Sequence, residues 1–170
     1  DLRQAAVSRI GDRWCLLVAD GEGGFRIIDA TDAHEAGGPA PRIGAVYAAD
    51  ARSVAPFRTT SERVLALVAD RKAGLRIVDV SIPAQPRQIA LVAAAEALDV
   101  AVADPPGALP RALLASQDGL LVIDLAAPEA PTIAGRIPGI AAFRVAVVDR
   151  DRSLFAALDR AGVRLVDCGD

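Results

Sequence analysis

The fold is decided by the stretch LALVADRKAGLRIVDV, residues 65–80. Two apolar runs rich in Leu, Val and Ile lie on either side of a short polar segment that contains Gly74. Apolar runs of this length, separated by a Gly-containing turn, are typical of two antiparallel strands joined as a hairpin. The stretch therefore predicts one β-hairpin, and variants of it occur four times along the chain.

The hairpin recurs at a regular spacing. Each copy has a glycine that opens its second strand and an aspartate that ends this strand: Gly24, Gly74, Gly119 and Gly162, and Asp29, Asp79, Asp124 and Asp167. The aspartates lie 79−29 = 50, 124−79 = 45 and 167−124 = 43 residues apart. Periods of about 40–50 residues are typical of the blades of β-propellers.

Each repeat holds further short apolar segments around its hairpin. The segments before the hairpins begin near Ala5, Val54, Val100 and Val145. After the first three hairpins, links that contain proline lead to segments around residues 43–46, 88–92 and 132–137. Proline cannot donate a hydrogen bond to a strand ladder, so these links predict breaks between strands. Four strands per repeat are typical of a propeller blade, and the fourth repeat lacks its last strand.

The predicted strands are apolar at nearly every position, as in LALVA at residues 65–69 and LLVI at residues 120–123. Such a strand must be covered on both faces. No segment between the strands has helical periodicity, so other sheets must cover them. We therefore expect an all-β fold: a β-propeller with about four repeats of a four-stranded antiparallel blade, as a single domain. The approximate repeats are 1–48, 49–93, 94–138 and 139–170, the last incomplete.

We expect these blades to be part of a larger ring, and a compact four-bladed ring is the alternative. The chain begins at Asp1 rather than at a methionine, which favours a processed or excised piece. A four-bladed ring would bring the first and fourth repeats together and would let Cys15 approach Cys168. Otherwise both cysteines are expected to be buried or unpaired thiols, because two are too few for a disulfide framework and lack metal-ligand spacing.

Composition excludes several classes of function. The net charge is −3 and the 19 basic residues are scattered, so we expect no nucleic-acid partner. No segment approaches the roughly 18–20 unbroken apolar residues that span a bilayer. The segment GEGG at residues 21–24 lacks the Lys and Ser/Thr of a phosphate loop and predicts only a hairpin turn. His34 is the sole histidine and lies in a polar loop, which argues against a histidine-based catalytic site. We expect no catalytic, cofactor-binding or metal-ligating residues in this sequence.

The repeats resemble the LVIVD-repeat family of bacterial β-propeller proteins. The resemblance rests on LRIVDVS at residues 75–81, followed by Pro83 and Pro86 and preceded by Asp70 and Gly74, and on LVID at residues 121–124. It implies a propeller in an extracytoplasmic protein, whether periplasmic, secreted or at the cell surface. It implies no established catalytic residues.

Two sets of charged residues recur with the repeats. For the four strand-end aspartates we expect hydrogen bonds from backbone N–H groups of the following turn, and a carboxylate ring that binds cations is the alternative. Asp20, Asp70 and Asp118 precede the hairpin glycines and receive the same interpretation. Arg26, Arg76 and Arg164 share one repeat position. We expect their stems to cover a blade edge while their head groups reach water or a nearby acid, and an anion site is the alternative.

The first strand of each repeat begins with a polar residue: Gln4, Ser53, Asp99 and Arg144. In a propeller these side chains would point toward the central channel or its mouth. We expect Asp99 and Arg144 to form an ion pair across adjacent blades. The pair would serve either as a structural lining of the channel or as part of a binding site.

The sequence favours a non-catalytic interaction or scaffold propeller in a larger assembly, which could be associated with a membrane. The partners would be other proteins or further blades of the same chain, bound through loops on a rigid framework. The loop residues we expect at the partner are Thr31, His34 and Glu35 in residues 31–41, and Asp104 and Pro106 in residues 104–110. The alternative is a fragment of a propeller enzyme, a hydrolase or redox subunit, whose active site lies outside these residues.

Overall fold

The structure, a computed structural model, describes residues 1–32 and 40–169, and within them all regular elements are strands. The first sheet contains β1 (Gln4–Ile10), β2 (Arg13–Ala19), β3 (Phe25–Asp29) and β4 (Arg42–Val46). The second contains β5 (Ala51–Arg58), β6 (Val64–Asp70), β7 (Gly74–Asp79) and β8 (Arg87–Ala93). The third contains β9 (Asp99–Ala103), β10 (Arg111–Ser116), β11 (Gly119–Asp124) and β12 (Thr132–Ile137). The fourth contains only β13 (Arg144–Asp149), β14 (Leu154–Asp159) and β15 (Gly162–Asp167).

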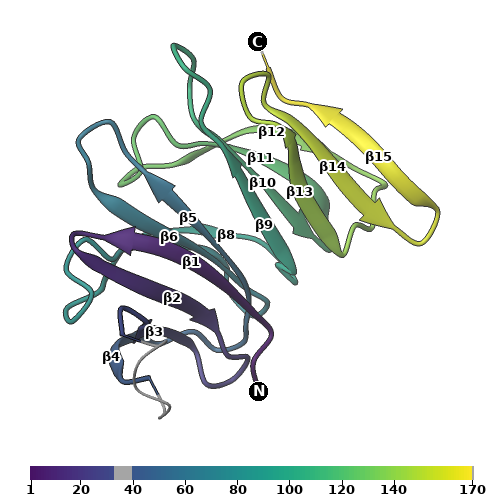
Figure 1. Ribbon diagram of the computed structural model, residues 1–170. Coiled ribbons are helices and arrows are strands. Elements are labelled where there is room, and N and C mark those ends of the chain that lie inside the picture. Colours follow the sequence, from purple (N-terminus) through teal and green to yellow (C-terminus); the bar gives the residue numbers. More distant parts are fainter. Residues whose placement is uncertain (33–39, 170) are drawn as a thin grey trace.

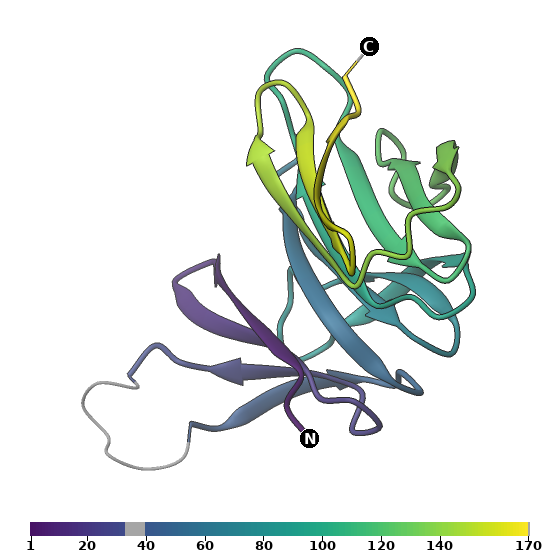
Figure 2. The ribbon, with the colours of Figure 1, turned by 90° about the vertical axis from the view of Figure 1, so that its right-hand side faces the viewer.

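The four sheets are stacked side by side in an arc (Figures 1 and 2). Within each sheet the strands pair in chain order, and all pairs are antiparallel. The first strands of successive sheets are neighbours: β1 contacts β5, β5 contacts β9, and β9 contacts β13. The predicted all-β fold of repeated antiparallel blades is therefore confirmed. The arc does not close, because the fourth sheet lies at the opposite end from the first (Figure 1).

The hydrophobic core consists of three layers, one in each gap between neighbouring sheets. Strand β6 shows how one strand serves two layers. Val64, Ala66 and Val68 pack in the layer shared with the first sheet, while Leu65, Leu67 and Ala69 pack in the layer shared with the third. Side chains alternate between the two faces of a strand, so a strand covered on both sides needs an apolar residue at every position. This explains the uninterrupted apolar run.

The four strand-end aspartates have the role expected of them. Each accepts a hydrogen bond from the backbone N–H two residues further on, within a turn. The donors are the backbone amides of Thr31 at 3.1 Å, Ser81 at 3.0 Å, Ala126 at 2.8 Å and Gly169 at 2.9 Å. These carboxylates therefore close turns at the ends of separate sheets.

The repeated arginines pair with the aspartates at the start of the hairpins. Arg26 lies 2.8 Å from Asp20, Arg76 lies 2.8 Å from Asp70, and Arg164 lies 3.1 Å from Asp159. The expectation of a nearby acid is thus confirmed.

The third sheet lacks both members of this pair. Leu121 replaces the arginine. Ser116 replaces the aspartate, because it lies opposite Gly119 in the strand register in the way that Asp70 lies opposite Gly74. Asp118, which the sequence groups with Asp20 and Asp70, lies in the hairpin turn of the third sheet and not at this strand position. The charged pair is therefore replaced as a unit.

Asp70 is the most buried of these aspartates, with a side chain inaccessible to solvent. Its carboxylate accepts hydrogen bonds from Arg76 and from the backbone amides of Ala49, Asp50 and Lys72. Burial alone would raise the pKa of Asp70, but the hydrogen bonds from Arg76 and the three amides outweigh burial and lower it. Because the pKa of Asp70 is lower in the folded protein than in the unfolded chain, Asp70 stabilises the fold at any pH above its unfolded pKa. This contribution is lost as the pH falls through the folded pKa.

Replacing Asp70 with alanine should lower the free energy of unfolding by about 3–5 kcal/mol, because the mostly buried Arg76 would lose its carboxylate partner and three backbone amides would lose their acceptor. Urea denaturation at pH 7 measures this loss. Asp159→Ala is the matched control at the same repeat position, where the arginine is half exposed, and it should cost clearly less. Lowering the pH from 5 to about 3 should destabilise the wild type more than Asp70→Ala. Equal losses in the two variants would contradict this account of Asp70.

Both cysteines are free and buried. Cys15 lies in the core layer between the first two sheets and Cys168 in the layer between the last two, so the arc does not bring them together. Burial raises the pKa of both thiols, that of Cys168 to about 11. Within the described residues there is also no helix that could cross a membrane.

The Cys168 thiol should react slowly with thiol reagents in the native protein, because only about one thiol in a thousand is ionised at pH 8. A colorimetric thiol titration at pH 8 should show a slow reaction without denaturant and two rapid equivalents in guanidinium. Cys168→Ala should remove one of these two equivalents. Rapid stoichiometric modification of native protein would contradict the burial described here.

Candidate functional site

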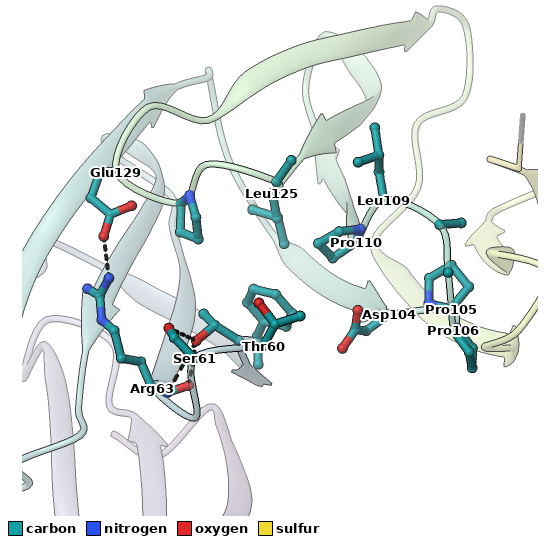
Figure 3. Close-up of a pocket in the computed structure, with 16 residues that line it drawn as sticks. Thr60, Ser61, Arg63, Asp104, Pro105, Pro106, Leu109, Pro110, Leu125 and Glu129 are labelled. Carbon is teal, nitrogen blue, oxygen red and sulfur yellow. Dashed lines mark hydrogen bonds and ion pairs between the residues drawn. The ribbon is translucent and has the colours of Figure 1, made fainter.

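A pocket of about 650 Å³ lies at the loop edge of the second and third sheets (Figure 3). Three segments surround it: residues 59–63 of the β5–β6 turn, residues 104–110 of the β9–β10 loop, and residues 125–129 of the β11–β12 link.

The walls of the pocket are mostly apolar. Phe57 and Leu125 belong to the core layer between the second and third sheets and also line the pocket, with 6% and 1% of their surface exposed. Leu109 stands at the rim and is 44% exposed. Four prolines complete the lining: Pro105, Pro106, Pro110 and Pro128. Proline restricts its own backbone, so these loops lose little conformational freedom when a ligand binds.

Arg63 joins the two sheets at one end of the pocket. It lies 2.9 Å from Asp79 of its own sheet and also forms an ion pair with Glu129 of the third sheet. The hydrogen bond from Arg63 lowers the pKa of Glu129. Its hydrogen bonds to Glu129 and Asp79 raise the pKa of Arg63 in turn. The charges of this group are therefore largely satisfied within the protein.

Among the described lining residues, Asp104 is the acidic side chain that has no such partner. It is half-buried, and Figure 3 shows its carboxylate between Thr60 and the loop that carries Pro105 and Pro106. Within residues 1–32 and 40–169 it forms no hydrogen bond or ion pair with other side chains. A half-buried carboxylate beside an apolar wall favours a cationic ligand group.

A second, smaller pocket of about 400 Å³ lies where the first strands of the sheets begin, and four segments contribute to it. Its lining residues are Leu2, Arg3, Arg52, Leu98, Phe143 and Arg144. Arg144 Nη1 lies 3.9 Å from Asp99 Oδ1, so the two side chains do form an ion pair across adjacent sheets. The function of this pair at a channel mouth remains a prediction.

Asp99 and its counterparts mainly connect one sheet to the next. In each of the first three sheets, a polar residue at or near the start of the first strand accepts a hydrogen bond from a backbone amide of the following sheet. Gln4 Oε1 accepts from the Val54 amide at 2.5 Å, Ser53 Oγ from the Val100 amide at 3.4 Å, and Asp99 Oδ2 from the Val145 amide at 2.9 Å. We call these three hydrogen bonds the inter-sheet clasps.

The clasps were missed in the sequence because the three acceptors differ in type. They share an acceptor oxygen, and in the second and third sheets the acceptor residue directly precedes the residue whose amide donates to the previous sheet. This pattern becomes visible only when the repeats are aligned and the sheets are stacked. Arg144 occupies this position in the fourth sheet and has no side-chain acceptor.

The loop residues predicted to bind a partner divide into three groups. Asp104 and Pro106 line the large pocket. Thr31 is not part of it: its backbone amide and hydroxyl donate to Asp29, and its hydroxyl accepts from the Trp14 amide, so it completes a turn of the first sheet. His34 and Glu35 lie outside the described residues. Sequence reasoning missed Phe57, Thr60 and Leu125, although the density of prolines at residues 105–110 and 128–131 was a usable signal.

Comparison with known proteins supports the fold and leaves the function open. Residues 65–92 match the family described as LVIVD repeat, which confirms the resemblance for this part of the chain. No curated protein matches the chain. It is similar to a crystal structure of a functionally unknown protein from Desulfotomaculum acetoxidans DSM 771, with 12% identity and a TM-score of 0.67. The match covers 100% of this chain and 53% of that one, so this chain spans about half the length of the similar structure.

Asp99→Ala should lower the free energy of unfolding by about 1–3 kcal/mol, because the Val145 amide would lose its acceptor in a buried position. Arg144→Ala should cost much less, since the Arg144 side chain is 55% exposed and exposed ion pairs contribute little. Urea denaturation of the two single variants and the double variant separates the clasp from the ion pair. A larger effect of Arg144→Ala than of Asp99→Ala would contradict the clasp.

Proposed function

We propose that this chain, which carries an LVIVD repeat, is a non-catalytic interaction or scaffold propeller that binds a protein partner in the pocket between its second and third sheets. The observation that supports the proposal most directly is the combination of apolar pocket walls with one carboxylate, Asp104, that has no hydrogen bond or ion pair with another side chain among the described residues. Protein-binding sites characteristically combine an apolar anchor pocket with a few polar groups that fix orientation.

The chemistry of the pocket favours a peptide segment with a Lys or Arg next to a large apolar side chain. The apolar side chain would contact Phe57, Leu125 and the prolines, and the cation would pair with Asp104. Arg63 and Glu129 already neutralise each other, so they offer little attraction to a charged ligand. The rigid proline loops reduce the entropy cost of binding.

The hydroxyl groups in the pocket do not form a nucleophile with a base. Thr59 Oγ1 accepts the Arg63 amide at 3.1 Å and lies 3.0 Å from Ser61 Oγ. Among the residues that the structure describes, the lining contains no histidine or cysteine. A nucleophilic hydroxyl needs an adjacent general base, which supports binding rather than catalysis at this place.

The alternative is a segment of a propeller enzyme, a hydrolase or redox subunit, whose reacting groups lie outside these residues. The greater length of the similar structure leaves room for such groups. We also propose an extracytoplasmic location, with a membrane-associated assembly as a special case, and the family resemblance is its only support.

Selection from a displayed peptide library on the immobilised chain should enrich peptides with a basic residue beside a large apolar one. Asp104→Ala should weaken binding of the selected peptides about tenfold or more, because the cation loses its partner in a partly desolvated site. Isothermal titration calorimetry measures the change. Asp12→Ala, in the exposed β1–β2 turn, is the matched control and should bind as the wild type does. Equal binding by Asp104→Ala, or enrichment of acidic peptides, would overturn the proposal.

A further inference from the structure

The fourth sheet has an apolar face that nothing in the described structure covers. Side chains that lie opposite one another in the strand register share a face, and one face of this sheet packs on the third sheet through Val145, Phe155, Ala157 and Val166. The other face carries Ala146, Ala156 and Leu165 in its central row. The two rows beside it hold Leu158 and Val163 next to Arg144, and Leu154 between Asp149 and Asp167. We call this other face the trailing face of the fourth sheet. Val148, Val163 and Leu165 are 55%, 65% and 66% exposed.

The three internal layers show what covers such a face. Val163 and Leu165 follow the hairpin glycine Gly162 by one and three residues. The same two positions are held by Phe25 and Ile27 in the first sheet, Leu75 and Ile77 in the second, and Leu120 and Val122 in the third. All six are buried, with at most 7% exposed, because the next sheet lies on them. In this arc, therefore, a trailing face is covered by the opposite face of another sheet.

The first sheet offers this opposite face at the other end of the arc. Its leading face, which points away from the second sheet, carries Val7, Trp14, Leu16 and Ile28. In the second sheet the positions of Trp14, Leu16 and Ile28 are held by Val64, Ala66 and Val78, which are buried beneath the first sheet. In the first sheet Val7 and Trp14 are 57% and 50% exposed.

We propose that the trailing face of the fourth sheet binds the leading face of the first sheet of a second copy of this chain. The two faces differ from each other, so the contact is heterologous, and such contacts form a ring when the rotation closes. Two arcs related by a two-fold axis would form both contacts at once and place eight sheets around one axis. Propellers of four to eight blades are known, so this number lies within the range of the fold.

The contact between copies would differ from the internal layers in one respect. Arg144 stands where Gln4, Ser53 and Asp99 provide the acceptors of the inter-sheet clasps, and its side chain cannot accept a hydrogen bond. The contact would therefore depend on apolar burial, and substitutions on the two faces should be enough to break it. The inference does not rest on the proposed partner pocket, which lies between the second and third sheets.

Analytical ultracentrifugation of the 170-residue chain should give twice the 17.6 kDa chain mass. Val163→Asp/Leu165→Asp should raise the dissociation constant of the dimer about 100-fold or more, because charges would be buried in the contact. Both residues are exposed in the single chain, so its circular dichroism spectrum should not change. Ile82→Asp/Leu91→Asp is the matched control, with two exposed apolar residues (62% and 46%) away from both faces, and it should remain dimeric.

Val7→Asp/Trp14→Asp distinguishes a heterologous contact from pairing of two fourth sheets. It should also produce a monomer, whereas a dimer formed by two trailing faces would survive it. Mixing this variant with Val163→Asp/Leu165→Asp should restore a heterodimer, since one contact then joins two wild-type faces, and native mass spectrometry would detect it.

Three results would overturn the inference. The first is a monomeric wild type at 100 µM, roughly the concentration at which micromolar contacts are saturated. The second is a dimer that survives either face variant. The third is a concentration-dependent series of larger species, which would show that the rotation does not close.

Discussion

Coverage of both faces of every sheet is the constraint on which the rest of this structure depends. A single sheet of this chain would leave rows of Val, Leu and Ile in water, at a cost of about 1.5–3 kcal/mol for each large side chain. Each added sheet covers the exposed apolar face of the sheet before it, but its own other face is then uncovered. The arc grows by one sheet per repeat for this reason, and each of its two ends keeps an apolar face.

Apolar stacking alone does not fix how one sheet sits on the next, because apolar contacts have little direction. The inter-sheet clasps supply this direction, since each ties one side chain to one amide of the neighbouring strand. The Arg63 group has the same effect at the loop edge, where it joins the second sheet to the third. The large pocket lies beside this group, so its two walls are held at a fixed separation by the contacts that also hold the sheets together.

Much of the fold could be predicted because its signals are local and repeated. The Gly74 turn, the strand-end aspartates and the proline links each mark a strand boundary by a rule of short-range backbone chemistry. The site was harder to predict. Asp104 and Pro106 were recognised as loop residues, but Phe57 and Leu125 look like ordinary core residues until two sheets are placed side by side. Thr31 looked equally available, yet its hydroxyl and amide are used by its own turn. Whether a polar side chain already has its hydrogen-bond partners depends on residues that are close in three dimensions, and the spacing of residues in the sequence does not reveal them.

Because the main contacts between the described sheets join immediate neighbours, cooperativity within one chain runs along one dimension. The second and third sheets are held on two sides, whereas the first and fourth are held on one. In such a linear array, stability is the sum of what each unit contributes and what each junction adds. In the single chain the terminal units should therefore open before the middle ones, so that amide hydrogens in β6 and β10 exchange with solvent later than those in β2 and β14.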